Sequence, residues 1–303
     1  MASRQPCRRG YQPWPFNGCI KLVTHNIQTI TRCSKRLLAD PSVIYSWQEI
    51  EVQEQVIPCI TALLKNDWRK LRLHYGTQIQ LAEGTFKRGR RVAIGVHSDL
   101  QGKTLDLHDA NLVALRESGR WVEIMVPYGD GTRHLIIANF YGLPGANNCP
   151  SIYRDNERLI TAAFWRAAQF GSTPYFLNGD FNVDPAKSDI CVTFTSNGLL
   201  HDLGFDWAAD KNSLQNTFRK EKINGDMVGK GTSRLDTIFT NEPGKSLVQD
   251  VSYDWGISAG CDHLAMIVTL NCDLSSQIVT RTVMPCPHRS VAHCSCGPCP
   301  QRP

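Results

Sequence analysis

The sequence lacks the long apolar segments that would place a protein in or across a membrane. No stretch of its 303 residues approaches the roughly 18 uninterrupted apolar residues of a membrane span. Residues 1–18 contain arginines but no apolar segment of the kind found in secretory signal peptides. We therefore expect no membrane span and no signal peptide, which predicts an intracellular protein and leaves the nucleus open as its compartment.

The sequence also lacks a compact cysteine framework, an internal repeat and a large excess of charge. Most of the 12 cysteines stand singly and far apart, which favours reduced thiols over a set of disulfides. The formal net charge of +5 is compatible with a phosphate-bearing partner but is far from that of a polybasic tail. The length fits one large domain with tails.

Composition divides the chain into three parts. Residues 1–18, rich in Arg, Pro and Gly, predict a flexible basic leader, and residues 19–273 predict the folded domain. Residues 274–303 are rich in Pro, Cys and His and predict an unpacked tail. The tail holds enough ligands for a Zn²⁺ site, although their spacing is cramped and a disordered tail remains the alternative: Cys286, His288, His293, Cys294, Cys296 and Cys299.

Strand patterns dominate the domain. Residues 19–26 and 42–47 predict strands that are each followed by a helical pattern. The middle of the chain is strand-dense, with short turns between the predicted strands at 75–81, 91–97, 111–116, 121–126 and 134–140. Residues 151–170 predict an amphipathic helix. The fold class that follows is α/β, a four-layered sandwich of two packed mixed β-sheets flanked by helices.

Residues 174–182, with the sequence PYFLNGDFN, are an apolar run that ends abruptly in polar residues. Gly179 permits a close backbone approach, and Asp180 and Asn182 are two residues apart, so on a strand both would point into one pocket. A strand-to-turn junction explains the same residues, because Gly, Asp and Asn are common in turns. The rest of the chain must decide between these interpretations.

Polar residues recur at the ends of predicted strands in five separate segments. They are Asn26; Glu49; Tyr141; Asp180 with Asn182; and Asp236, followed by the Asp262-His263 pair. Each one alone has an ordinary structural explanation, such as capping a turn, starting a helix or pairing with a neighbouring charge. Together they interrupt apolar strands at one end, which is typical of a shared functional site.

These residues occur in six short motifs, His-Asn-Ile at 25–27, Trp-Gln-Glu at 47–49, Asn-Phe-Tyr-Gly at 139–142, Gly-Asp-Phe-Asn at 179–182, Ser-Arg-Leu-Asp-Thr-Ile-Phe at 233–239 and Asp-His at 262–263. In type and order they resemble the endonuclease/exonuclease/phosphatase superfamily, whose members include DNase I-like nucleases. The closest likeness is to non-LTR retrotransposon and apurinic/apyrimidinic endonuclease domains. The resemblance spans residues 21–271 and implies the same sandwich fold.

Phosphodiester hydrolysis requires a cation, an activated water and donors for the developing charge, and oxygen ligands suit Mg²⁺, with Mn²⁺ as a possible substitute. The resemblance implies a metal site at Asn26, Glu49 and Asp262. It also implies that Asp180 orients or deprotonates the attacking water and that Asn182 and Tyr141 contact the phosphate. His263 would face the scissile phosphate, with its ring oriented by Asp236.

Two departures from apurinic/apyrimidinic endonucleases make repair of abasic sites doubtful. Gln28 stands where those enzymes have an aspartate, and their Tyr-x-Pro-Asn pattern is replaced at 141–145, with Asn147 or Asn148 as the nearest asparagines. Basic clusters at 87–91 and 219–222 suit a phosphate backbone, although a solvated loop face explains them equally well.

The predicted function is a Mg²⁺-dependent phosphodiester hydrolase, foremost a retroelement-like endonuclease acting on DNA, with nucleic acid as its partner and a monomer assumed. The alternative is a phosphatase or phosphodiesterase acting on a small-molecule or lipid phosphate. A non-catalytic binding domain is a third class, disfavoured by the retained acidic and histidine residues.

Overall fold

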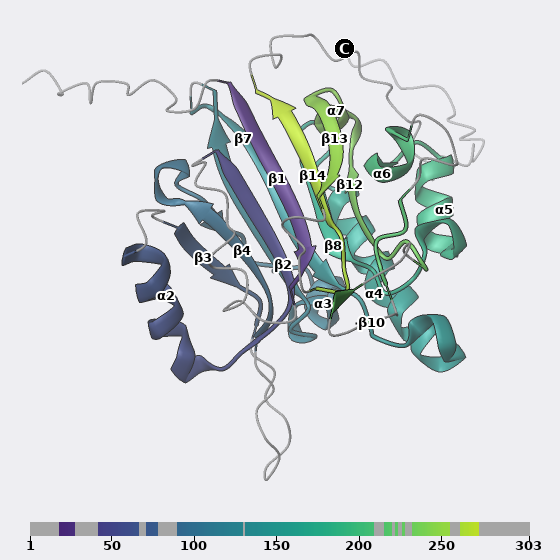
Figure 1. Ribbon diagram of the computed structural model, residues 1–303. Helices are drawn as coiled ribbons and strands as arrows, with labels where there is room; N and C mark the ends of the chain where they lie inside the picture. The colour runs from purple at the N-terminus through teal and green to yellow at the C-terminus, as the bar shows by residue number, and fades with distance from the viewer. Residues whose placement is uncertain are drawn as a thin grey trace, which may run out of the picture.

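Two six-stranded β-sheets lie face to face around the main apolar core (Figure 1). The structure is a computed structural model that describes residues 18–27, 42–66, 71–77, 90–129, 131–208, 215–219, 222–223, 226–227, 232–254 and 261–272. The first sheet has the order β13 (Val248–Asp254), β14 (Ala265–Asn271), β1 (Cys19–Asn26), β2 (Val43–Val52), β4 (Arg90–His97) and β3 (Leu71–Tyr75). The second has the order β5 (Lys103–Thr104), β6 (Trp121–Tyr128), β7 (Arg133–Tyr141), β8 (Tyr175–Asp180), β12 (Asp236–Thr240) and β9 (His201–Asp202).

Both sheets are mixed. Within the described residues, each contains one parallel pair, β1–β2 in the first sheet and β7–β8 in the second, while the other neighbouring strands run antiparallel. The carboxyl ends of two parallel strands lie at the same edge of a sheet. The antiparallel strands β14 and β12, which pair with β1 and β8, therefore begin at the edge where β1 and β8 end.

The sheets are held together by side chains that alternate along each strand. Ile20 and Leu22 of β1 and Phe176 of β8 point between the sheets and belong to the largest buried cluster. The opposite face of β8 is also buried, because Tyr175 and Leu177 belong to a second cluster beneath the helices. Burial on both faces explains why this strand is a continuous apolar run rather than an alternating one.

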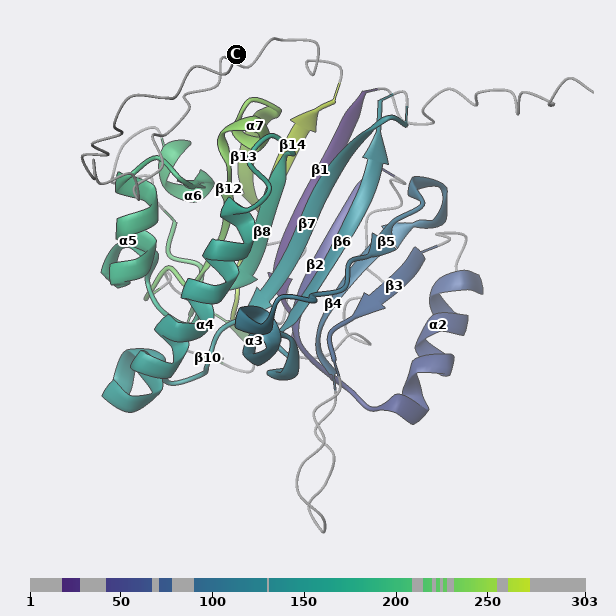
Figure 2. The same cartoon turned by 180° about the vertical axis from the view of Figure 1, so that it is seen from behind.

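Helices cover the outer face of the second sheet (Figure 2). Ile160, Ala163 and Phe164 of α4 (Pro150–Ala168) pack on that face together with Phe194 of α5 (Asp189–Ser196). On the first sheet, Ile60 of α2 (Ile57–Asn66) joins the outer cluster. The predicted α/β sandwich of two packed mixed sheets flanked by helices is confirmed.

The remaining elements are short. The helices are α3 (Val113–Glu117), α6 (Leu203–Asp206) and α7 (Glu242–Lys245), and the 3₁₀ turns are η1 (Glu54–Val56), η2 (Ser98–Leu100), η3 (Ala110–Leu112), η4 (Ala146–Asn148) and η5 (Pro185–Lys187). The strands β10 (Lys222–Ile223) and β11 (Asp226–Met227) form a two-stranded ribbon. In the part of the chain that the structure describes, no helix is both long and apolar enough to cross a bilayer.

One predicted strand was wrong, and another lies mostly outside the described residues. Residues 111–116 lie in η3 and α3, where Leu112 and Leu115 pack into the cluster beneath α4. Their spacing of three residues brings both to one side of a helix, a period that is hard to distinguish from alternation in so short a segment. Of the strand expected at 75–81, Tyr75 is the last residue of β3, Gly76 and Thr77 belong to no strand, and residues 78–81 lie outside the described residues.

Several predictions fall outside the described residues. They concern most of the basic leader at 1–18, a helical pattern after β1 and the tail at 274–303 with its six possible Zn²⁺ ligands. The domain limits at 19 and 273 therefore stay predictions, as does the zinc site.

Candidate active site

The polar residues that the sequence places at strand ends come together at one edge of the sandwich. Asn26, Tyr141 and Asp180 are the last residues of β1, β7 and β8. Asp236 begins β12, directly opposite Asp180 in the antiparallel ladder. His263 lies two residues before β14, which begins at the same edge. Strand direction thus gathers the residues of each sheet at one edge, and the packing of the two sheets brings Asn26 and His263 next to Asp180 and Asp236.

A cavity of about 580 Å³ opens at this edge. Seven of the eight predicted site residues line it: Asn26, Glu49, Tyr141, Asp180, Asn182, Asp262 and His263. The eighth, Asp236, lies behind His263 and holds its ring. The cavity therefore brings the predicted site residues together at one edge of the sandwich.

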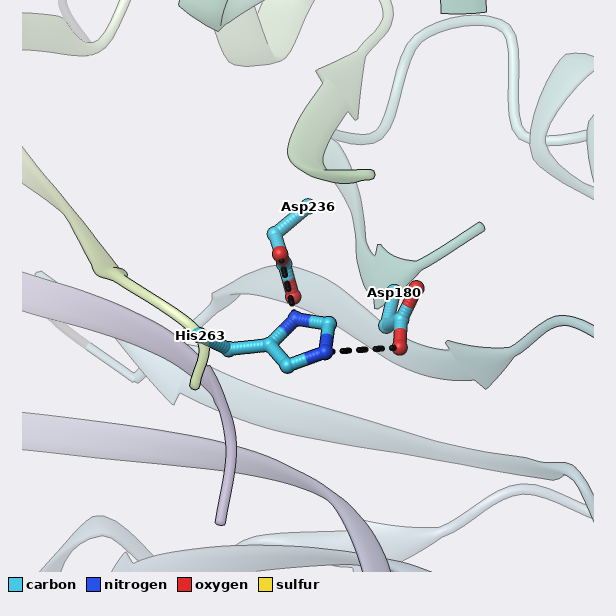
Figure 3. A group of neighbouring side chains, drawn as sticks. All are labelled: Asp180, Asp236 and His263. Carbon is cyan, nitrogen blue, oxygen red and sulfur yellow. Dashed lines mark hydrogen bonds and ion pairs between the residues drawn. The ribbon is translucent and has the colours of Figure 1, made fainter. Parts of the chain in front are cut away.

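His263 lies between two carboxylates, as Figure 3 shows. Its Nδ1 is 2.8 Å from Oδ2 of Asp236, and its Nε2 is 3.9 Å from Oδ2 of Asp180. Burial disfavours the charged ring, but Asp236 and then Asp180 outweigh it and raise the pKa of His263 to about 10. The raised pKa favours the charged ring at neutral pH, in which Nδ1–H donates to Asp236 and Nε2–H faces Asp180.

Asp180 is buried at the floor of the cavity and is also hydrogen-bonded. Its Oδ2 accepts from Nδ2 of Asn26 at 2.9 Å, and its Oδ1 accepts from the backbone N–H of Asn182 at 2.9 Å. Burial raises the pKa of Asp180 to about 7, against the opposing effect of the His263 charge. A carboxylate has about four acceptor positions, so each oxygen can still accept from a substrate or a water.

Glu49 reaches the cavity through an irregular stretch of β2. The ladder between β2 and β4 shifts register after Gln48 and resumes at Val52, and Glu49 has a φ of 57°. Burial raises the pKa of Glu49, partly offset by a hydrogen bond from Asn26 and by the charge of His263. Asn26 thus interacts with both carboxylates and links the two sides of the site.

Tyr141 contributes a neutral hydroxyl. Burial and the nearby charges of Asp180 and Glu49 raise its pKa well above the ordinary value. Arg120 lies under the ring, with its guanidinium carbon 4.7 Å from the ring centre, and donates to the carbonyl oxygens of Tyr141 and Gly142. Burial and the neighbouring Arg91 lower the pKa of Arg120 to about 10. No sequence pattern predicted this support, because Arg120 lies outside the predicted strands, directly before β6.

Asn182 lines the cavity for a different reason from the one predicted. The strand ends at Asp180, and Asn182 adopts a left-handed φ of 53° instead of continuing the alternation. Its Nδ2 donates to the carbonyl oxygen of Gly142 at 3.1 Å, and Gly142 N–H donates to the carbonyl oxygen of Asp180 at 2.7 Å. Asn182 and Asp180 share the cavity because this turn folds back on the end of β7.

The architecture is found in solved structures of nucleases and related proteins. An endonuclease/exonuclease/phosphatase family protein from Leptotrichia buccalis matches with a TM-score of 0.55 and 18% identity, covering 82% of this chain and 98% of its own. An AP endonuclease from Archaeoglobus fulgidus matches with a TM-score of 0.58, 16% identity and coverage of 83% and 99%. The endonuclease domain of TRAS1, a telomere-specific non-LTR retrotransposon, matches with a TM-score of 0.52, 16% identity and coverage of 83% and 98%.

The chain has the endonuclease/exonuclease/phosphatase fold. The sequence matches no family model, and no curated protein is similar enough to be matched. The predicted resemblance to the DNase I-like superfamily is thus confirmed at the level of the fold.

Within this endonuclease/exonuclease/phosphatase fold, the site has enough close ligand atoms to hold a metal ion. One ligand atom each from Asp180, Asp236 and His263 lie within 4.8 Å of one another. The hydrogen bond from His263 to Asp236 favours a proton on that nitrogen while no metal is bound. Glu49, which also interacts with Asn26, provides a further carboxylate for an ion in the cavity.

The rim of the cavity differs from what the basic clusters suggested. Arg90 forms a 2.9 Å ion pair with Glu54, and Arg91 is buried. Neither of these two members of the cluster at 87–91 presents a free guanidinium to a phosphate. Residues 87–89 and 220–221 lie outside the described residues. Lys187 and Phe218, which the sequence did not single out, line the cavity instead.

Proposed function

We propose that the protein is a Mg²⁺-dependent phosphodiester hydrolase that cuts DNA as an endonuclease. The observation that supports this most is the arrangement of His263 between Asp236 and Asp180 on the floor of an open cavity. A cationic donor beside a carboxylate with a pKa near neutrality is what phosphodiester hydrolysis needs at physiological pH.

The donor set of the cavity fits a hard divalent cation. Glu49 and Asp180 are carboxylates whose pKa values are raised by burial, so an ion of opposite charge would stabilise their ionised forms. We assign the metal to Glu49 with Asn26 and Asp262 beside it, a set of oxygen ligands that suits Mg²⁺ and tolerates Mn²⁺. When bound, the ion would supply positive charge against the developing charge of the phosphoryl group.

Asp180 is placed to orient and deprotonate the attacking water. Its two oxygens are fixed by Asn26 and by the backbone of Asn182, so the carboxylate cannot rotate freely. With a pKa of about 7 it is substantially ionised near neutral pH and still basic enough to accept a proton. The proton taken from the water would reside on Asp180 when the phosphorus–oxygen bond of the leaving strand breaks.

Three donors surround the position where charge develops. His263 directs its remaining N–H toward Asp180 and the cavity, because Asp236 holds the other. Tyr141 keeps its proton, since burial and two carboxylates raise its pKa. The amide of Asn182 lines the same cavity. Preorganised donors of this kind stabilise a transition state without reorganising during the reaction.

DNA as the substrate, and a retroelement-like role, are supported by less direct observations. The TRAS1 domain, one of the similar structures, is an endonuclease of a non-LTR retrotransposon. The chain carries a net charge of +5, and Lys187 provides a cation at the cavity wall. A phosphatase or phosphodiesterase acting on a small phosphoester would use the same central residues and is the alternative function.

The test is to incubate the purified full chain with supercoiled plasmid, single-stranded RNA or a phosphoinositide, each with Mg²⁺ or with EDTA. We expect nicked plasmid only with Mg²⁺, and loss of nicking by a factor of about 100 or more in Asp180→Asn and in His263→Ala. Hydrolysis of the phosphoinositide without nicking would favour the alternative. No hydrolysis of any substrate by a folded protein would contradict the proposal.

A further inference from the structure

A layer of polar side chains lies between the two sheets, directly beneath the cavity. We name this layer the polar belt, and its members are all fully buried: Thr24, Ser46, Gln48, Asn139 and Asn178. Elsewhere the same inter-sheet space is filled by apolar residues. Each belt strand continues into the site, because the belt residues precede Asn26, Glu49, Tyr141 and Asp180 by one to three positions. Polar groups at this depth need hydrogen-bond partners across the sheets.

Asn139 makes most of the connections across the belt. Its Nδ2 donates to the carbonyl oxygen of Trp47 at 2.8 Å and to that of Ala93 at 2.9 Å. Its Oδ1 accepts from Nε2 of Gln48 at 2.5 Å, and Gln48 also donates to Thr24. Asn139 belongs to β7 of the second sheet, whereas all of these partners belong to the first. One side chain therefore ties β7 to two adjacent strands of the opposite sheet.

The contacts of Asn139 fall where the β2–β4 ladder loses its regular pairing. Trp47 pairs with Ala93, and after the next pair the register shifts until Val52. Inside the irregular segment, Glu49 has a φ of 57° and Glu51 a φ of 42°. A left-handed backbone is unfavourable for residues with a Cβ and persists only where surrounding contacts impose it. Asn139 holds the last regular residues before this segment.

We propose that Asn139 is a positioning residue that fixes the irregular segment of β2 and so directs Glu49 into the cavity. It acts through Gln48 and the backbone of Trp47, and its own side chain is buried and does not line the cavity. Because Tyr141 is two residues further along β7, the same strand sets the position of both groups. The inference rests on the proposed function to the extent that Glu49 is taken as a metal ligand.

The first measurement is hydrogen–deuterium exchange of the metal-free protein. Asn139→Ala should accelerate exchange in the segment 48–52 by a factor of about 10 or more, because its support across the sheets is lost. Ile137→Val is the matched control: Ile137 lies two residues earlier on β7, faces the same layer and is fully buried. The control should leave this segment unchanged. Exchange in Asn139→Ala that equals that of the control would overturn the proposal.

The second measurement is Mn²⁺ affinity by calorimetry, in wild type, Asn139→Ala, Glu49→Gln and the double variant. We expect affinity to fall about 10-fold in Asn139→Ala, a typical effect of losing an outer support of a ligand, and to change less than about twofold in Ile137→Val. In the Glu49→Gln background the effect of Asn139→Ala on Mn²⁺ affinity should largely disappear, because Asn139 affects metal binding by positioning Glu49. Should Asn139→Ala fail to fold, Asn139→Ser, which keeps one donor, takes its place with the same expected direction.

The outcomes separate the two proposals. If the losses of Mn²⁺ affinity in Asn139→Ala and Glu49→Gln multiply in the double variant, Asn139 does not act through Glu49. An unchanged Mn²⁺ affinity in Asn139→Ala would contradict the proposal as well. A wild-type protein that binds no Mn²⁺, or a Glu49→Gln variant with unchanged affinity, would instead contradict the metal site of the proposed function.

Discussion

Nδ1 of His263 lies 2.8 Å from Oδ2 of Asp236, and this hydrogen bond connects segments that belong to different sheets. His263 precedes β14 in the first sheet, and Asp236 begins β12 in the second. The charge of the histidine therefore depends on how the sheets pack, because the buried ring would lose its proton more easily without the carboxylate.

The first prediction concerns Asp236→Asn. We expect the pKa of His263 to fall from about 10, because only the charges of Asp180 and Asp262 then oppose the effect of burial. The measurement is an NMR titration of the imidazole resonances in EDTA, with His263→Gln to assign them. Plasmid nicking at pH 8 should fall about 100-fold in the same variant. An unchanged pKa would contradict the role given to Asp236.

The same hydrogen bond predicts how stability depends on pH. Folding raises the pKa of His263 from its ordinary value of 6.5 to about 10. The protonated ring therefore stabilises the folded protein fully below pH 6.5, and this stabilisation is lost as the pH rises toward 10. The free energy of unfolding of the metal-free wild type should fall by about 1–3 kcal/mol over this range. Urea titrations at pH 6, 8 and 10 measure it, and Asp236→Asn should show a smaller decrease.

Metal binding should raise the melting temperature. A divalent ion favours the ionised forms of Glu49 and Asp180, whose pKa values are raised by burial. Mg²⁺ at 100 times its dissociation constant stabilises the folded state by about 2.7 kcal/mol, which corresponds to about 5 °C or more for a domain of this size. Scanning calorimetry with and without EDTA measures the shift. Glu49→Gln should reduce it, whereas Glu117→Gln, an exposed glutamate outside the site, should not.

Much of the site could be predicted because it lies at strand ends. Asn26, Tyr141 and Asp180 each close an apolar run, and parallel strands bring such ends to one edge. The polar belt could not be predicted in this way. Asn139 and Gln48 resemble ordinary interruptions of a strand, and their pairing depends on how the two sheets are superimposed, which no local pattern contains.

The irregular backbone at Asn182 and Glu49 also could not be predicted from the sequence. The alternation of Asp180 and Asn182 suggested a continuing strand, but the chain turns at Asn182 with a φ of 53°. Likewise, the irregular segment at Glu49 contains no glycine, the residue that would have indicated a left-handed backbone there. Asparagine tolerates the left-handed region better than most residues, yet a single asparagine after a strand is too common to identify the turn.

A further prediction concerns Gly142, which follows Tyr141. A Cβ at this position would overlap with the carbonyl oxygen of Phe181, a backbone atom that cannot move aside easily. Gly142→Ala should therefore destabilise the protein by about 1–3 kcal/mol and reduce nicking, because the turn that carries Asn182 must shift. Urea denaturation and the plasmid assay measure the two effects. Gly131→Ala, which meets no atom within 4 Å and suffers only from a φ of 79°, should leave nicking unchanged.

The last prediction separates two buried tyrosines. Tyr141→Phe removes a hydroxyl that faces the cavity but keeps the ring on Arg120, so we expect kcat to fall about 100-fold with little loss of stability. Tyr175 donates to Oε1 of Glu123 at 2.7 Å and does not line the cavity. Tyr175→Phe should therefore cost about 1–3 kcal/mol of stability and leave kcat unchanged. Steady-state nicking and urea denaturation of both variants measure this, and equal losses of kcat would contradict a direct role for Tyr141.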